Sequence, residues 1–126
     1  MLVLITSPRK LSASDDASAF VMNHPPLMRV AVINHLQQSL RFIDSDSQQL
    51  QEMPENQKVV HEMFVGAANL PADQIHFDNA GIITQLFETF VFDVTDEGKT
   101  AYHRCCYENL RGERGPWSEP LQILVA

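Results

Sequence analysis

Arginine and tryptophan gather near the end of the chain, where their spacing could support binding. Arg104, Arg111 and Arg114 surround Trp117 in the sequence. A guanidinium above an indole ring is attracted to the ring's negative face. The four residues could therefore hold an acidic or planar ligand at a loop tip. They could also lock the last two strands together through a stacked arginine. We favour the structural role and keep all four as a candidate binding site.

The other reactive residues match no known catalytic or metal-binding pattern. Asp44 and Asp46 offer two carboxylates, but no glycine-containing calcium loop follows them. His103 and Cys105 share one face of a strand and have no third group to orient them. The five histidines lack the spacing of a helical zinc site, and we expect them to be surface or half-buried residues, unless strands bring distant ones together. They are His24, His35, His61, His76 and His103. We expect no metal, no cofactor and no enzymatic activity.

The two cysteines, Cys105 and Cys106, are adjacent. Neighbours on a strand point to opposite faces, so both cannot enter one core. A disulfide between neighbours would close a strained ring. We expect two thiols in packing roles, one buried and the other less buried.

A hairpin must position the arginine and tryptophan residues. Residues 100–107 are rich in threonine, tyrosine and cysteine, which suit a strand. Gly112 and Gly115 follow in a charged loop and can adopt positive φ at low cost. Pro116 has no amide donor and fits a strand start or edge. Residues 121–125 then form a short apolar strand. The pattern predicts two strands joined by a long polar tip.

This stretch resembles the last two strands of a fibronectin type III domain. The resemblance rests on Tyr102, on Glu108 and Asn109, on Gly112, and on the run 115–120, Gly-Pro-Trp-Ser-Glu-Pro. More narrowly, it is similar to the C-terminal β-domain of a group of uncharacterised bacterial proteins with an Arg-Gly-Glu, Gly-Pro-Trp-Ser-Glu ending. Trp117-Ser118 also resembles half of the cytokine-receptor Trp-Ser motif. The resemblance covers about a fifth of the chain and implies a stacked arginine beside Trp117.

Earlier segments also read as short strands. They cover residues 28–33, 36–43, 58–65, 81–84 and 86–94, with a loop at 66–77 and a polar loop at 48–57. In the 86–94 strand we expect Phe90, Phe92 and Val94 to face the core. Residues 36–53 also fit helical spacing, although 44–47 (Asp-Ser-Asp-Ser) would interrupt a helix. Turn-separated short strands favour an all-β sandwich of the fibronectin type III or immunoglobulin-like type, with about seven strands.

Composition limits the organisation and the partners. The chain has 126 residues, and we divide it into a loop-rich N-terminal segment, 1–26, and a sandwich, 27–126. Residues 1–6 read as a candidate edge strand, followed by a loop at 7–16. The apolar start is too short for a signal peptide or a membrane span. A net charge of −7 with 9 lysines and arginines disfavours nucleic acids and anionic membranes.

The sequence thus predicts a non-enzymatic accessory or protein-interaction module, which binds a protein partner or a second copy of itself. The alternative is a small carbohydrate-binding or hydrolase domain that uses carboxylates in a cleft.

Overall fold

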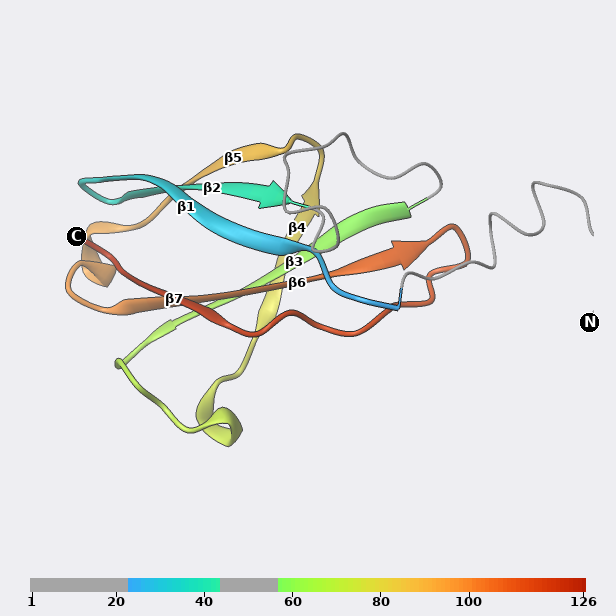
Figure 1. Ribbon diagram of the computed structural model, residues 1–126. Helices are drawn as coiled ribbons and strands as arrows, with labels where there is room; N and C mark the ends of the chain where they lie inside the picture. Colours follow the sequence, from blue (N-terminus) through green and yellow to red (C-terminus); the bar gives the residue numbers. More distant parts are fainter. Residues whose placement is uncertain (1–22, 44–56) are drawn as a thin grey trace, which may run out of the picture.

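The computed structural model describes residues 23–43 and 57–126. In this part of the chain, seven strands form two antiparallel sheets that pack face to face (Figure 1). One sheet has the order β1-β2-β5 and the other the order β4-β3-β6-β7. The strands are β1 (Leu27–Asn34), β2 (Gln37–Ile43), β3 (Gln57–Gly66), β4 (Asp78–Ile83), β5 (Phe87–Val91), β6 (Thr100–Asn109) and β7 (Leu121–Leu124). The predicted all-β sandwich of about seven strands is confirmed.

Alternate side chains of the two sheets fill the space between them. Leu40 and Phe42 of β2 are at most 1% exposed and share one apolar cluster with Val59 of β3 and Tyr107 of β6. A smaller cluster forms around Phe92. The central pair, β3 and β6, is aligned over the full length of both strands. This long pairing forms the centre of the second sheet.

Residues 37–43 form a strand, so the alternative helix over 36–53 is wrong for this part. Leu36, just before the strand, has a φ of 56°, which closes the turn between β1 and β2. Its N–H donates to the Ala126 carbonyl, and its own carbonyl accepts from Phe92 N. A helix would place Leu40 and Arg41 about 100° apart, whereas here Leu40 is buried and Arg41 exposed, as a strand requires.

The strand predicted over 86–94 is shorter than expected. β5 ends at Val91, and a 3-10 turn, η2 (Val94–Asp96), follows it. Asp93 caps this turn, because its side chain accepts from Thr95 N. Phe92 faces the core and Phe90 is half-buried against it, but Val94 is 63% exposed. The expectation that Val94 faces the core was wrong because the cap ends the strand's alternation before it.

The segment between β3 and β4 folds against the outer face of the second sheet (Figure 1). It contains a second 3-10 turn, η1 (Ala72–Gln74). The hydroxyl of Tyr102 donates to the Ala67 carbonyl at 2.5 Å and accepts from Leu70 N at 3.0 Å. Tyr102 is fully buried as a result. Strand β4 then begins earlier than the predicted 81–84 strand, and Gly81 lies at a bulge with a φ of 122°.

The predicted hairpin of the last two strands is present as β6 and β7. The expected strand at 1–6 and the loop at 7–16 lie outside the described residues, as does the polar loop at 48–57 except for its last residue. Gln57 was expected in that loop but begins β3, where it pairs with Asn109. The division of the chain between residues 26 and 27 stays a prediction. No helix in the described part of the chain is long and apolar enough to cross a membrane.

Candidate functional site

Arg104 lies between two aromatic rings on the outer face of the second sheet. Its guanidinium carbon is 4.1 Å from the ring centroid of Trp117 and 4.3 Å from that of Phe77. Its Nε and Nη2 atoms also donate to Oε1 of Glu62, at 2.9 and 2.6 Å. Glu62 is the cross-strand partner of Arg104 on β3, so the sheet register creates this ion pair. The arginine stacking predicted from the sequence is present.

Arg114 joins the same layer from the loop between β6 and β7. Its Nε donates to Glu108 Oε1 at 3.0 Å, and its guanidinium carbon is 5.6 Å from the Trp117 centroid. Lys58 Nζ lies 3.3 Å from the other oxygen of Glu108. The hydrogen bond from Arg114 is the main reason that the pKa of Glu108 lies below its ordinary value. Arg114 and Lys58 thus hold Glu108 as a carboxylate.

Arg111 lies apart from this layer, at the tip of the loop. The loop is organised by Asn109, which is fully buried. The Oδ1 atom of Asn109 accepts from Arg111 N and Glu113 N, both at 2.9 Å, and its Nδ2 donates to Glu113 Oε1. Gly112 supplies the positive φ, 83°, that this tight turn needs. The structure therefore brings Arg104, Arg114 and Trp117 together but leaves Arg111 exposed.

Asn109 carried part of the fold resemblance but was not among the predicted site residues. Asparagine at the start of a loop often bonds to backbone N–H groups nearby, and this tendency could have identified it. The binding role of the four predicted residues stays a prediction. Their geometry favours a packing layer, because each face of the Arg104 guanidinium already lies against a ring.

The adjacent cysteines point to opposite faces of β6, as predicted. Cys105 belongs to the core, where its Sγ lies 3.7 Å from Ser118 Oγ. The charges of Arg114, Glu108, Glu62 and Arg104 act on Cys106, which places it under the outer layer. Burial raises the pKa of Cys105 to about 12 and that of Cys106 to about 11.

Cys106 lies less deep than Cys105, as expected, but neither side chain is open to solvent. Both side chains are 0% exposed, because the arginine and tryptophan layer covers the outer face as well. At neutral pH both groups are therefore thiols, which are poor nucleophiles.

Two histidines lie in the core, contrary to the expectation of surface or half-buried positions. His61 of β3 and His103 of β6 are each 0% exposed. Their rings stack with centroids 5.1 Å apart, and His61 Nε2 lies 2.9 Å from His103 Nδ1. The signal in the sequence was a spacing of two residues, which places side chains on the same face of a strand. His61 lies two positions from the core residue Val59, and His103 two positions from Ala101 and Cys105. The described residues contain no group of three or more histidines, cysteines or acidic residues placed to hold a metal. Asp44 and Asp46 lie outside those residues.

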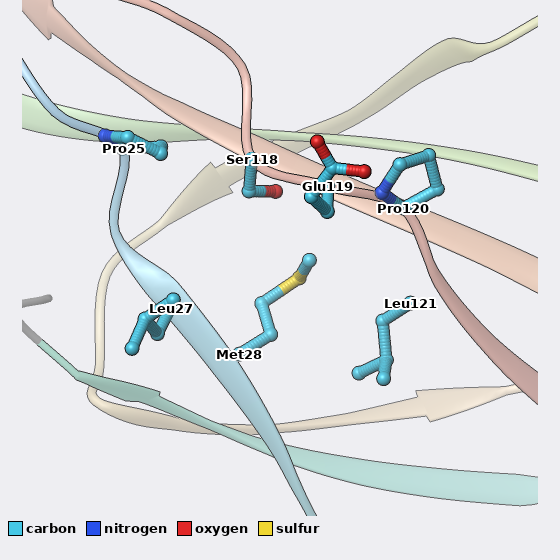
Figure 2. Close-up of a pocket in the computed structure, with 7 residues that line it drawn as sticks. All are labelled: Pro25, Leu27, Met28, Ser118, Glu119, Pro120 and Leu121. Atoms are coloured by element: carbon cyan, nitrogen blue, oxygen red, sulfur yellow. The ribbon is translucent and has the colours of Figure 1, made fainter.

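A shallow apolar pocket of about 290 Å³ lies where the start of β1 meets the segment before β7 (Figure 2). Leu27 and Met28 line it from β1, and Pro120 and Leu121 from the other side. Glu119 at its edge is the single carboxylate among its lining residues. A glycosidase needs two carboxylates on opposite sides of a bound sugar, and this pocket does not provide them.

The outer face of the β1-β2-β5 sheet carries exposed apolar side chains on both of its edge strands. Val32 of β1 is 45% exposed, and Phe87 and Val91 of β5 are 43% and 73% exposed. Between them, Ser39 and Thr89 join their hydroxyl groups at 2.8 Å. Cross-strand pairing places Val32 beside Ser39 and Ser39 beside Thr89. We call the surface formed by Val32, Ser39, Phe87, Thr89 and Val91 the open face.

Comparisons with known proteins identify the fold. No family model matches the chain, and no curated protein sequence matches it. Among solved structures, it is similar to the third fibronectin III domain of the human KIAA0343 protein, with a TM-score of 0.54 and 13% identity over 94% of this chain and 91% of that one.

It is also similar to the twitchin kinase region from C. elegans (Fn31-NL-kin-CRD-Ig26), with a TM-score of 0.58 and 15% identity. That match covers 82% of this chain but 16% of the twitchin chain. The protein therefore has a fibronectin type III-like fold. The narrower resemblance to a bacterial group stays a prediction.

Proposed function

We propose that the protein is a non-enzymatic interaction module that binds a protein partner, or a second copy of itself, through the open face. The supporting observation is the contrast between the two sheets in the described residues. The central part of the outer face of β4-β3-β6-β7 is covered by the 67–77 segment and by the Arg104 and Trp117 layer. On its edge strands, Ile82 and Leu124 stay 46% and 57% exposed, but the covered central strands separate them. The open face instead leaves Val32, Phe87 and Val91 accessible.

The composition of the open face suits a protein partner. A cluster of exposed apolar side chains with a polar rim is typical of protein interaction surfaces. Arg41 is the cross-strand partner of Phe87, and Gln37 is the cross-strand partner of Val91. Each of these two apolar side chains therefore has a polar neighbour on β2. The net charge of −7 makes a protein a better partner than a nucleic acid or an anionic membrane.

The carbohydrate-binding or hydrolase alternative has less support. The pocket in Figure 2 offers one carboxylate, Glu119, and two prolines rather than an exposed aromatic platform. Domains with the fibronectin III fold commonly mediate protein interactions, which agrees with the module. We therefore place the function on a sheet face and not in this pocket.

The test is a charge placed at Val91, the most exposed apolar residue of the open face and the last residue of β5. Val91→Glu should weaken binding of a captured partner, or self-association measured by sedimentation velocity, by at least about tenfold, because a carboxylate resists burial. Leu110→Glu is the matched control: Leu110 is 61% exposed but lies at the end of the β6–β7 hairpin. Equal binding by the wild type and Val91→Glu would refute the open face as the docking surface.

A further inference from the structure

A chain of hydrogen bonds crosses the core from β3 to β7. His61 Nε2 lies 2.9 Å from His103 Nδ1, and His103 Nε2 lies 2.8 Å from Gln38 Oε1. Gln38 Nε2 then donates to the carbonyls of Ile123 and Leu124, both at 3.2 Å. The three side chains are at most 1% exposed. Four strands, from both sheets, are thus joined through one buried polar chain.

The direction of every bond in this chain follows from its last member. Backbone carbonyls only accept hydrogen bonds, so the Gln38 amide nitrogen faces β7 and its oxygen accepts from His103. We therefore assign the proton of His103 to Nε2, which leaves Nδ1 to accept from His61 Nε2–H. The Nδ1 atom of His61 is then an unprotonated nitrogen. It is buried and has no hydrogen-bond partner.

Within the hydrogen-bonded set of His61, His103 and Gln38, the Nδ1 atom of His61 is the nitrogen whose lone pair can accept a proton. Its surroundings oppose the positive charge that protonation would create. Phe42 and Phe90 pack against the ring, and His103 and Cys105 of β6 are the titratable groups beside it. Glu88 also points inward from β5, but its Oε2 accepts from backbone N–H groups at residues 84 and 85. A buried imidazolium without an acceptor is costly.

Burial accordingly lowers the pKa of His61 to about 4. Burial, with repulsion from His61, lowers the pKa of His103 to about 3. Both values lie well below those of histidines in an open, hydrated state. Weak acid therefore favours any conformation in which water reaches the pair.

Strand β7 is the element whose detachment would admit that water. It has four residues and pairs on one side with β6, where Leu121 lies opposite His103. Gln38 binds its last two carbonyls. By contrast, β3 and β6 pair over ten positions. Release of β7 uncovers His103 and breaks the Gln38 bonds while it leaves the long pairing intact.

We propose that Gln38, His61 and His103 form an acid-sensitive latch that fastens the C-terminal strand β7. At neutral pH the uncharged pair completes the chain of bonds and holds β7 closed. As pH falls, proton uptake by the pair stabilises a conformation with β7 released and the edge of β6 exposed. An exposed strand edge is a surface for pairing with another strand, so the latch would couple acidity to association.

Amide hydrogen exchange tests this at pH 7, 6 and 5, with correction for intrinsic exchange rates. The Val125 amide reports on β7, because it donates to the Lys99 carbonyl, and the β3–β6 ladder reports on global opening. Below pH 6.5, the protection of Val125 should fall by up to about tenfold per pH unit for each proton taken up on opening. The β3 amides exchange through global unfolding, which takes up the same protons, so Val125 should stay less protected than they are at every pH. Equal protection of Val125 and the β3 amides at every pH, or no loss in β7, would overturn the proposal.

Two further measurements distinguish the latch from general acid sensitivity. The double variant His61→Phe/His103→Gln has no titratable side chain in the buried hydrogen-bond chain, so its β7 protection should no longer depend on pH. The control His35→Gln changes an exposed histidine and should behave like the wild type. If the double variant does not fold, the NMR chemical shifts of the imidazole nitrogens in the wild type test the assigned tautomers instead. They should show a neutral His61 protonated at Nε2 at pH 6. A protonated Nδ1 there, or a pH dependence retained by a folded double variant, would reject the latch.

Discussion

Arg104 has three partners at once: two aromatic rings and one carboxylate. The guanidinium plane allows this combination, because its faces stack on rings while its edge donates hydrogen bonds. The half-buried Trp117 indole thereby holds the segment before β7 against β6. Ser118 continues the same contact, since its N–H donates to the Cys105 carbonyl and its Oγ accepts from Cys105 N.

Removal of the indole should therefore lower stability. We expect Trp117→Ala to reduce the free energy of unfolding by about 3 kcal/mol, at the lower end for large-to-small aromatic changes because Trp117 is half-buried. Arg104→Ala should cost about 1 kcal/mol, since its side chain is 29% exposed and its contacts are partly solvated. Urea unfolding measures both changes.

Arg111→Ala is the matched control, because Arg111 is exposed at the loop tip. Its stability should match the wild type within about 0.5 kcal/mol. A Trp117→Ala protein as stable as the wild type would contradict the packing role. It would also move Arg104, Arg111, Arg114 and Trp117 to the first place among candidate ligand sites.

At the scale of elements, the 67–77 segment is held against the sheet by one side chain from β6. The Tyr102 hydroxyl satisfies two backbone groups of this segment, the Ala67 carbonyl and the Leu70 N–H. Phe64 packs beside Tyr102, with ring centroids 6.0 Å apart. Without the hydroxyl, the segment would keep its apolar contacts but lose its anchor points.

Tyr102→Phe should destabilise the protein by about 1–2 kcal/mol, because two backbone groups lose their partner. The change should also speed proteolytic cleavage in the 67–77 segment more than it speeds cleavage elsewhere. Limited proteolysis followed by mass spectrometry locates the cuts. Thr84→Val removes an exposed hydroxyl whose single hydrogen bond, to Glu88, is long at 3.4 Å and far from the segment, so it should change both quantities little. Cleavage of both variants at the wild-type rate would show that the tyrosine does not anchor the segment.

At the scale of the whole molecule, the two buried histidines make stability depend on pH. The folded-state pKa values of His61 and His103, about 4 and about 3, are lower than the ordinary value of 6.5. Below pH 6.5 the unfolded chain therefore binds protons that the folded chain does not bind. Stability is fully present above this pH and is lost as pH falls toward 4, by up to about 1.4 kcal/mol per pH unit for each histidine.

Urea midpoints at pH 7.5, 6, 5.5 and 5 test this expectation. The lowered pKa of Glu108 acts in the same direction, but only below its ordinary value of 4.5, so the chosen range isolates the histidines. His61→Phe/His103→Gln should show a flatter profile, and His35→Gln should keep the wild-type slope. A wild-type midpoint that is constant from pH 7.5 to 5 would mean that the pair takes up no protons on unfolding.

The sequence alone predicted the local features of this fold. Alternating apolar residues and turn signals located the described strands, including the β6–β7 hairpin, because strand alternation and turn preferences act over a few residues. The C-terminal end of β5 was predicted too late, because the apolar pattern continues to Val94. The hydrogen bond by which Asp93 caps η2 ends the strand earlier. The stacking of arginine on Trp117 was also foreseen, through the resemblance to fibronectin type III domains.

Only the tertiary structure decided which distant residues meet. The register of β3 with β6 places Glu62 beside Arg104 and, together with Gln38 of β2, creates the buried histidine chain. Residues 42 positions apart become neighbours through that register, and no local pattern encodes it. The burial of Cys106 on the outer face also depends on packing, because Arg114 and Trp117 fold back over β6 from the connection that follows it. The amino-acid sequence determined the strands and their faces; packing and strand register determined the site.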